Sequence, residues 1–511
     1  MIQLNISSLI AALKLEKDVS DFSLCLLSGL LLGASFLSQW LWPLALFGLV
    51  PFLQVLFSQE FRKSSCWNIF LHGWFFGFVF IGTVIVWFWQ AYPFSWPFRH
   101  EALALPLILA IWSIVAITLS VVFGFLSLAI TKLTKPNWTL YLTVPALWVL
   151  SEYLRMWVFF VVTYGSGTLV GAHFSVGFLG YSLAPNPLLL QLASWGGVYA
   201  LSFSAVLVNL WLYKMYTKEH NHLKFAVVVA GVTLLLQVGG VIGVELMKQL
   251  PSPTNQDVVR TALLTTNFSN NRVSTRERHI VYTELLSELS ESDPEVDLVF
   301  FPEAANFVSK VYQNPDSILN KFSSSTVFID SMNLRQYDDT VIKSIYQYSS
   351  LDKLTHVREK QFFVPVGEYM PNIIRALFKL TGVYDDYVAS RGNSFYYVPG
   401  EHGNGLVTNG DNVKVQTLLC SEILSPSLYN KSGQPAAILA NLSSHSYFHQ
   451  SGIVFNQVLS MARVQAVYNN KPFVQAANGA PSFVLDRKGQ VIAMSAGAQT
   501  VVTVELPISK H

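Results

Sequence analysis

The sequence predicts an α-helical membrane domain followed by an α/β domain, because its two halves differ in charge and in apolar pattern. Only 20 of the 64 Lys, Arg, Asp and Glu residues lie in the first 250 positions, and 44 lie in the last 261. The first half contains apolar stretches of about 20 residues, the length that crosses a bilayer. The second half alternates short apolar runs with helical patterns, as layered α/β domains do. We therefore expect a transmembrane helical domain over 1–250 and an extramembrane domain over 251–511.

Seven apolar stretches of the first half are expected to span the membrane. They lie at roughly 22–38, 41–58, 68–90, 103–131, 139–162, 188–213 and 225–247. The first stretch lacks a small-x-small cleavage site, so we interpret it as a retained helix rather than a signal peptide. A Gly-rich segment at 163–187 is too broken to span, and we expect either a re-entrant segment that supports the second domain or an ordinary external loop.

Basic residues predict the orientation of these spans. If the N-terminus is cytoplasmic, the outer loops before the second domain carry only Arg99 and Arg155. The inner loops then carry Lys14, Lys17, Arg62, Lys63, Lys132, Lys135, Lys214, Lys218 and Lys224. Cytoplasmic loops are enriched in Lys and Arg, so this asymmetry indicates that everything after about residue 250 faces outward.

The second half begins after a short Pro-rich linker, 251–255, and its pattern predicts alternating strands and helices. Strands are expected at 258–265, 296–302, 325–330, 340–346, 362–366, 413–419, 436–442, 472–476, 482–485 and 490–494. Helices are expected at 275–290, 371–381 and 453–470. The helix at 371–381 is amphipathic, so it either lies in the headgroup plane or packs on the protein core.

Three chemically active side chains are expected at the ends of these elements. Glu303 closes the apolar run 296–302, and we expect partial burial to raise its pKa toward the range of a general base. Lys360 precedes the run 362–366 and could stabilise an oxyanion, with Glu368 orienting its ammonium group. Taken singly, the glutamate could be a helix-start charge and the lysine a solvated surface residue.

Cys420 is the third of these side chains. It follows the strand-like run 413–419 and precedes a short helix-like start at Glu422, where backbone N–H groups favour a thiolate. An isolated cysteine is more often a small buried apolar residue. Here the other two cysteines, Cys25 and Cys66, lie in or beside apolar stretches of the first half, so the second domain holds one unpaired thiol.

Composition excludes several other classes of function. The net charge of +2 and the lack of an arginine-rich or stacking motif argue against a nucleic-acid partner. The sequence contains no His-Glu-x-x-His or paired Cys-x-x-Cys motif, so we expect neither a metal nor another cofactor.

Taken together, the three residues resemble a known pattern. Phe301-Pro302-Glu303, then Lys360 with the block 364–371, then Cys420-x-Glu422 is similar to the Glu–Lys–Cys series of the nitrilase superfamily. The membrane half narrows the resemblance to the apolipoprotein N-acyltransferases, which add the third acyl chain to bacterial lipoproteins. Supporting stretches lie at 180–203 and 461–466, with Pro472, Asn478 and Gly479 after them.

The resemblance implies a fold, a reaction and a location. The fold would be an αββα nitrilase-like sandwich on a transmembrane base. Glu303 would be the general base, Lys360 the oxyanion stabiliser and Cys420 the nucleophile that carries a thioester. The donor would be a phospholipid, typically phosphatidylethanolamine, and the acceptor the α-amino group of a diacylglyceryl-modified N-terminal cysteine. The enzyme would be a multi-pass protein of the bacterial inner membrane with its catalytic domain in the periplasm, and we expect a monomer.

Departures from the family pattern concentrate around the predicted pocket. Ser421 stands where the family usually has an aromatic residue, and His445 and Tyr447 replace a carboxylate and a tryptophan in the segment 443–449. With Tyr369 and Phe378, we expect these residues to line the substrate site or its lid. The family's final transmembrane helix has no counterpart, because 500–506 reads as a strand, so the C-terminus is expected outside.

Three alternatives stay open from the sequence. The protein could be a membrane-bound amidase or acyltransferase of the same superfamily with another acceptor, which Ser421 and His445 favour. It could be a hydrolase in which His445 or His449 acts as base for Cys420, although Glu303 and Lys360 would then be unexplained. It could also be a binding protein on an inactive nitrilase scaffold.

Overall fold

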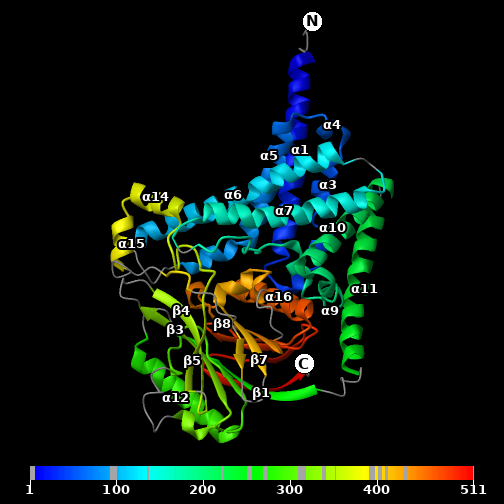
Figure 1. The fold of residues 1–511 in the computed structure, drawn as a ribbon. Helices are drawn as coiled ribbons and strands as arrows, with labels where there is room; N and C mark the ends of the chain where they lie inside the picture. The colour runs from blue at the N-terminus through cyan, green and yellow to red at the C-terminus, as the bar shows by residue number, and fades with distance from the viewer. Residues whose placement is uncertain are drawn as a thin grey trace.

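A computed structural model provides the architecture (Figure 1). It describes residues 6–92, 101–134, 137–166, 168–219, 222–249, 256–268, 273–308, 318–335, 341–351, 353–390, 397–400, 406–408, 413–430 and 436–509. The predicted linker at 251–255, together with Arg99 and Lys135 of the loops, lies outside these residues.

The first half consists of helices that form one apolar bundle. Its long helices are α1 (Ile6–Ala34), α5 (Cys66–Val84), α6 (Glu101–Leu133), α7 (Leu140–Val162), α10 (Ala193–Glu219) and α11 (His222–Gln249). Its short helices are η1 (Gln39–Leu41), α2 (Leu44–Phe47), α3 (Val50–Leu56), α4 (Gln59–Arg62), η2 (Val86–Ala91), α8 (Leu179–Leu183) and α9 (Pro187–Leu190). Many apolar side chains on the outside of the bundle are exposed, as expected where lipid replaces water as the surrounding medium.

Six stretches within the described residues are long and apolar enough to cross a membrane, against about seven expected. The difference is the first stretch, whose apolar helical part, Ser20–Ala34, is too short by itself. The expected span at 41–58 has the required composition but is divided among η1, α2 and α3. Pro43 stands directly before α2 and Pro51 in the first turn of α3, and proline cannot continue a helix from the preceding turn.

The second half contains two six-stranded sheets. The first has the order β12-β1-β2-β3-β4-β5 and the second β11-β10-β9-β8-β7-β6. The strands of the first sheet are β1 (Gln256–Thr265), β2 (Leu298–Phe300), β3 (Val327–Arg335), β4 (Val341–Ser349), β5 (Lys353–Glu359) and β12 (Thr500–Ser509). Those of the second are β6 (Leu406–Thr408), β7 (Lys414–Leu419), β8 (Ile438–Ser444), β9 (Phe473–Asn478), β10 (Phe483–Leu485) and β11 (Val491–Met494).

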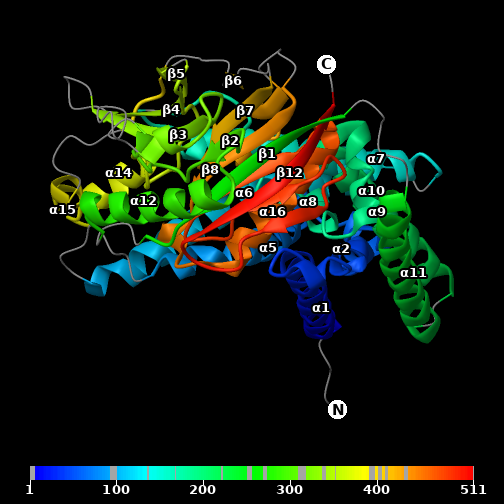
Figure 2. The ribbon, with the colours of Figure 1, turned by 90° about the horizontal axis from the view of Figure 1, so that it is seen from below.

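The two sheets pack face to face and are covered by a helix on each outer side. Buried residues such as Leu263 and Phe300 of the first sheet share one core with Leu419 and Leu442 of the second. Helix α12 (Thr275–Ser292) packs on the outer face of the first sheet, and α16 (Gly452–Asn469) on that of the second. This arrangement confirms the expected αββα sandwich on a helical membrane base, seen from the side away from the membrane helices in Figure 2.

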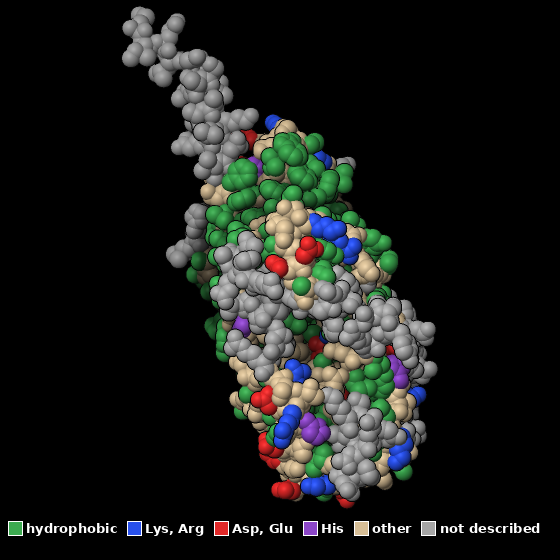
Figure 3. All heavy atoms as spheres, turned by 90° about the vertical axis from the view of Figure 1, so that its left-hand side faces the viewer, with side chains coloured by type: hydrophobic (Ala, Val, Ile, Leu, Met, Phe, Trp, Pro, Cys, Tyr) green, Lys and Arg blue, Asp and Glu red, His purple; other side chains and the backbone are tan. Residues whose placement is uncertain are grey.

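Helix α16 also joins the sandwich to the membrane bundle. Its residues belong to the same buried cluster as those of α10, and Figure 1 shows it between the sheets and the membrane helices. The Gly-rich segment 163–187 makes a second connection, because Ser175 donates its backbone N–H to Leu424 O over 3.0 Å. This contact favours the interpretation in which the segment supports the second domain over the interpretation in which it is an ordinary external loop. Figure 3 shows the resulting contrast, with hydrophobic side chains over the bundle and charged ones over the sheets.

The prediction of a strand at 362–366 is wrong. Residues 361–371 form a loop in which Val366 N donates to Tyr369 O over 2.7 Å, and the Glu368 side chain takes the N–H of Val364 that a strand neighbour would need. Pro365 has no N–H to offer. The strand at this place in the chain is β5, which ends one residue before Lys360 and was missed because its short polar sequence lacks an apolar alternation.

Candidate active site

Glu303 and Cys420 meet because each follows a strand that ends at the same edge of the sandwich. Glu303 lies three residues beyond β2, and its backbone N–H donates to Ser443 O of β8, in the other sheet, over 3.4 Å. Cys420 directly follows β7, the neighbour of β8. In parallel pairs such as β7 and β8 the carboxyl ends lie together, so the two residues approach each other across the sheets.

Lys360 reaches the same point from β5. Its backbone N–H donates to Lys343 O of β4 over 2.7 Å, which aligns the two lysines side by side. The Lys360 ammonium donates to Glu303 Oε1 over 3.1 Å and to Glu368 Oε1 over 2.9 Å. The side chain is completely buried, so both ion pairs operate away from water.

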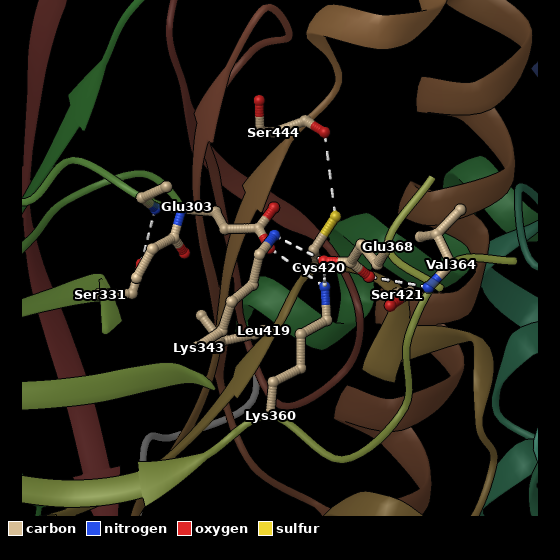
Figure 4. Close-up of polar contacts among 12 residues, drawn as sticks. Glu303, Ser331, Lys343, Lys360, Val364, Glu368, Leu419, Cys420, Ser421 and Ser444 are labelled. Carbon is tan, nitrogen blue, oxygen red and sulfur yellow. Dashed lines mark hydrogen bonds and ion pairs between the residues drawn. The ribbon is translucent and has the colours of Figure 1, made fainter. Parts of the chain in front are cut away.

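Figure 4 shows these groups converging around the Cys420 sulfur. The structure therefore brings together Glu303, Lys360, Glu368 and Cys420 of the residues predicted from sequence. It adds Lys343, whose ammonium lies 2.9 Å from Glu303 Oε1 and 2.5 Å from Glu368 Oε1. Sequence reasoning missed Lys343, because only the pairing of β4 with β5 places it beside Lys360, and β5 was not predicted.

The Cys420 backbone adopts an uncommon conformation. Its φ of +43° lies in the left-handed region, which costs a residue other than glycine roughly 1–2 kcal/mol. The tight turn aims the thiol toward Ser444 O, the acceptor of its hydrogen bond at 3.8 Å, rather than into the sheet core. Strain of this kind at a strand end is common where a reactive side chain must be presented.

Two pKa expectations from the sequence are wrong in sign. Burial does favour the protonated form of Glu303, but the ammonium groups of Lys343 and Lys360 together outweigh it and lower the pKa of Glu303 to about 2. For Cys420, burial is the main influence and the carboxylates of Glu303 and Glu368 add to it, so its pKa rises to about 12 despite Lys360. The resting site thus holds an ionised glutamate and a protonated thiol.

Glu368 and Glu422 are held by backbone as well as side-chain partners. Glu368 Oε2 accepts the Val364 N–H over 2.7 Å, which closes the turn beneath the lysines. Glu422 is fully buried and accepts from Arg358, from Gln361 N and from Leu419 N, at 2.8, 2.9 and 2.8 Å. It thereby ties the Cys420 turn to the end of β5.

The two residues that depart from the family pattern closest to the thiol are both buried. Ser421 donates its hydroxyl to Phe362 O over 2.6 Å. His445 follows Ser444, and its ring Nδ1 has no hydrogen-bond partner among the described residues. Burial lowers the pKa of His445 to about 4 even though the Glu303 carboxylate opposes that shift, so its imidazole is neutral at physiological pH.

The remaining predicted pocket residues have different environments. Tyr369 is buried and donates its hydroxyl to Thr163 O in the Gly-rich segment over 3.0 Å. Tyr447 is 40% exposed. Phe378 of α14 (Asn372–Leu380) is buried against Leu107 of α6, so α14 packs on the bundle, while Ile373 and Leu380 remain exposed.

Among the residues with a described placement, no group of three or more His, Cys, Asp or Glu side chains could hold a metal ion. What the arrangement can do is general acid–base and nucleophilic chemistry. It offers a thiol, a carboxylate that can accept its proton, and an ammonium beside both.

Comparison with known proteins gives two sets of sequence matches. Residues 28–211 match the family profile described as the apolipoprotein N-acyltransferase N-terminal domain. The chain is 25% identical over 489 residues to a protein of Rickettsia bellii named apolipoprotein N-acyltransferase, covering 92% of this chain and 87% of that one. A protein of the same name from Geobacter metallireducens is also 25% identical over 489 residues, covering 93% and 87% of the two chains.

Among solved structures, the chain is similar to a carbon-nitrogen hydrolase from Helicobacter pylori G27. The TM-score is 0.36 at 14% sequence identity, over 49% of this chain and 89% of that one. A mutant of the amidase from Nesterenkonia sp. AN1, in complex with butyramide, gives a TM-score of 0.35 at 12% identity, over 50% and 93% of the two chains.

Proposed function

We propose that this chain, which belongs to the apolipoprotein N-acyltransferase family, moves a fatty acyl chain from a phospholipid to the N-terminal amine of a diacylated apolipoprotein. The observation that carries the proposal is the meeting of Glu303, Lys360 and Cys420 at one edge of the sandwich, with the ammonium of Lys360 3.1 Å from Glu303 Oε1. That edge adjoins the segments that contact the membrane bundle, where a phospholipid ester can approach.

In the first half-reaction the thiol of Cys420 gives its proton to Glu303, and the thiolate attacks the ester carbonyl of the phospholipid. Negative charge develops on the carbonyl oxygen, and the Lys360 ammonium stabilises it. The intermediate then collapses into a Cys420 thioester. The departing glycerol oxygen takes the proton from Glu303, and a lysophospholipid leaves.

In the second half-reaction the α-amino group of the lipoprotein's N-terminal cysteine attacks the thioester. Glu303 takes a proton from the nitrogen and returns it to the Cys420 sulfur as the amide forms. Because Glu303 starts ionised and the thiol starts protonated, the proton transfer between them is part of each half-reaction. Two substrates that use one site in turn give ping-pong kinetics.

The sidedness of the protein is part of the same proposal. The nine basic residues assigned to inner loops support a cytoplasmic N-terminus. The proposal counts α1, which carries the apolar part Ser20–Ala34, as a seventh span, and an odd number of spans puts the sandwich on the opposite, periplasmic side of the inner membrane. Phosphatidylethanolamine is the proposed donor, since it is the typical donor that the family resemblance implies.

The decisive experiment separates the two half-reactions. Purified protein in detergent is incubated with phosphatidylethanolamine, and its intact mass is measured. We expect one acyl group on Cys420, which a synthetic diacylglyceryl lipopeptide then removes. Cys420→Ala should form no adduct, whereas Cys66→Ser, which replaces the exposed cysteine, should behave as wild type.

The alternative with another acceptor predicts a different second step. The segment at Ser444 and His445, which departs from the family pattern, lies at the thiol and is the observation that favours this alternative. An adduct that forms but is not transferred to the lipopeptide would support it. A wild-type rate of triacylation by Cys420→Ala would eliminate both candidates.

A further inference from the structure

Lys343 is a second ammonium group in the site, and its contacts are as close as those of Lys360. It lies 2.9 Å from Glu303 Oε1 and 2.5 Å from Glu368 Oε1, and its side chain is 11% exposed. Each of the two carboxylates is therefore bridged by both lysines through the same oxygen atom. The four charges form a closed, alternating ring in a buried place.

The two lysines occupy different positions relative to the thiol. Lys360 interacts electrostatically with Cys420 as well as with the two carboxylates. Lys343 interacts with Glu303, Glu368 and the ring of Tyr397, whose centroid lies 4.9 Å from its ammonium nitrogen. The ammonium group of Lys343 contacts the two carboxylates and the Tyr397 ring, so we infer that its influence on the reaction passes through Glu303 and Glu368.

The charge balance of the ring shows how Lys343 affects the ionisation of the two glutamates. Two ionised glutamates and two ammonium groups sum to zero, and the thiol adds no charge while it is protonated. Without Lys343, two buried carboxylates would share one cation. Like charges at such distances cannot both remain ionised in a poorly solvated place, so one carboxyl group would take up a proton.

We propose that Lys343 is a positioning residue that keeps Glu303 ionised and so sets the acid limit of Cys420 acylation. The inference rests on the proposed function, in which Glu303 must be ionised to receive the thiol proton. The groups that face this ring are Lys360 and Glu368, the thiol of Cys420, the phenol of Tyr397 and, toward Glu303, the neutral imidazole of His445. The low pKa of Glu303, to which both lysines contribute against the effect of burial, agrees with the proposal.

The test is a pH profile of Cys420 reactivity with two probes. One probe is acyl-adduct formation from phosphatidylethanolamine, and the other is alkylation by iodoacetamide, which needs no lipid substrate. Both are measured by mass on the full-length protein in a Cys66→Ser background, for the wild type, Lys343→Gln and Lys343→Arg. A catalytic carboxylate that loses its charge produces an acid limb in such a profile.

We expect wild-type acylation rates that change little between pH 8 and 5. Alkylation by iodoacetamide follows the thiolate fraction, so it is compared as the ratio of the variant's rate to the wild-type rate, which is constant unless Glu303 titrates in this range. Lys343→Gln should show an acid limb inside this range, with a rate that falls about tenfold per pH unit below its midpoint. Lys343→Arg keeps the charge and should keep the flat profile. A folded Lys343→Gln protein with a wild-type profile would overturn the proposal.

Two further measurements apply if Lys343→Gln does not fold or if no lipid adduct forms. If Lys343→Gln does not fold, the double variant Lys343→Met/Glu368→Gln removes one buried charge of each sign. Whatever its rate, it should fold and show no acid limb in acylation between pH 8 and 5. If it fails to fold while Glu368→Gln alone folds, Lys343 is needed for packing rather than for charge, which contradicts the proposal. If no lipid adduct forms even in the wild type, the proposed function fails, while the iodoacetamide profile still decides the role of Lys343.

Discussion

At Glu303, the local sequence and the tertiary surroundings shift the pKa of the carboxyl group in opposite directions. The apolar run before it buries the group, which favours the protonated form. Two ammonium groups from β4 and the end of β5 favour the ionised form more strongly, and the pKa falls to about 2. The same surroundings keep the Cys420 thiol protonated, mainly because it is buried and also because two carboxylates act on it against one lysine. The resting site therefore contains a base, the ionised Glu303, and an acid, the Cys420 thiol, rather than a preformed thiolate.

His445 gives a residue-scale prediction about pH. Its pKa falls from 6.5 to about 4 on folding, so between these values the unfolded chain binds a proton that the folded chain does not. Folding stability should therefore decrease as the pH falls from 6.5 to 4, by about 3 kcal/mol in total. In His445→Asn, the apparent melting temperature should depend less on pH within this window than in the wild type.

The matched control is His279→Asn, which replaces an exposed histidine of α12. It should leave the pH dependence of the melting temperature as it is in the wild type. If His445→Asn were as acid-sensitive as the wild type, the imidazole would not be the buried neutral group described above. That result would revive the reading in which His445 is the base for Cys420.

At the scale of elements, the site depends on a short turn that joins β7 to η4 (Cys420–Leu424). Glu422 lies inside this turn and accepts hydrogen bonds from the backbone N–H groups of Leu419 and Gln361 and from the Arg358 guanidinium. It thereby fixes the strained Cys420 backbone against the end of β5, from which Lys360 projects. One carboxylate, that of Glu422, thus fixes the position of Cys420 relative to Lys360.

Glu422→Gln should be strongly destabilising. The amide cannot balance the Arg358 charge, whose side chain is 7% exposed, and breaking a buried pair by neutralising one partner costs roughly 3–5 kcal/mol. Thermal unfolding of the detergent-solubilised protein should show a midpoint several degrees lower. Glu288→Gln, an exposed change on α12, should not move the midpoint, and a wild-type midpoint for Glu422→Gln would contradict the described clamp.

At the scale of the whole molecule, the sandwich stands on the bundle through elements of both halves. Helix α16 covers one sheet and contacts α10. The segment 163–187 contacts Leu424, at the end of η4, and Tyr369, the neighbour of Glu368. Burial of apolar area between α16 and the bundle holds the edge that carries Glu303, Lys360 and Cys420 close to the bundle. Under the proposed function, this arrangement lets a lipid substrate reach the thiol without leaving the membrane.

Cysteine labelling tests the orientation that this arrangement requires. Cys66 is exposed at the start of α5, which the proposed orientation assigns to the cytoplasmic side, and Glu295 has a side chain that is 78% exposed before β2. In intact spheroplasts, a membrane-impermeant maleimide should label Glu295→Cys in a Cys66→Ser background and should leave wild-type Cys66 unlabelled. Permeabilisation should expose Cys66, and the reverse pattern of labelling would invert the proposed topology.

The sequence alone determined the order of the two domains, most of the strands and the residues that end β2 and β7. Those features depend on local composition and on apolar periods of 2 and 3.6 residues, which can be read along the chain. It also predicted Glu303, Lys360 and Cys420 as site residues through their motifs, and the structure brings their side chains together, while their catalytic roles stay a prediction.

Only the tertiary structure decided that Lys343 belongs to the site and that Glu303 is ionised beside a protonated thiol. The strand β5 escaped prediction because Lys353–Glu359 is mostly polar, and without it the pairing that brings Lys343 to Lys360 could not be inferred. The ionisation states follow from charges on strands far apart in the chain. Electrostatic energy depends on distance in space and on burial, and neither can be obtained from the order of residues.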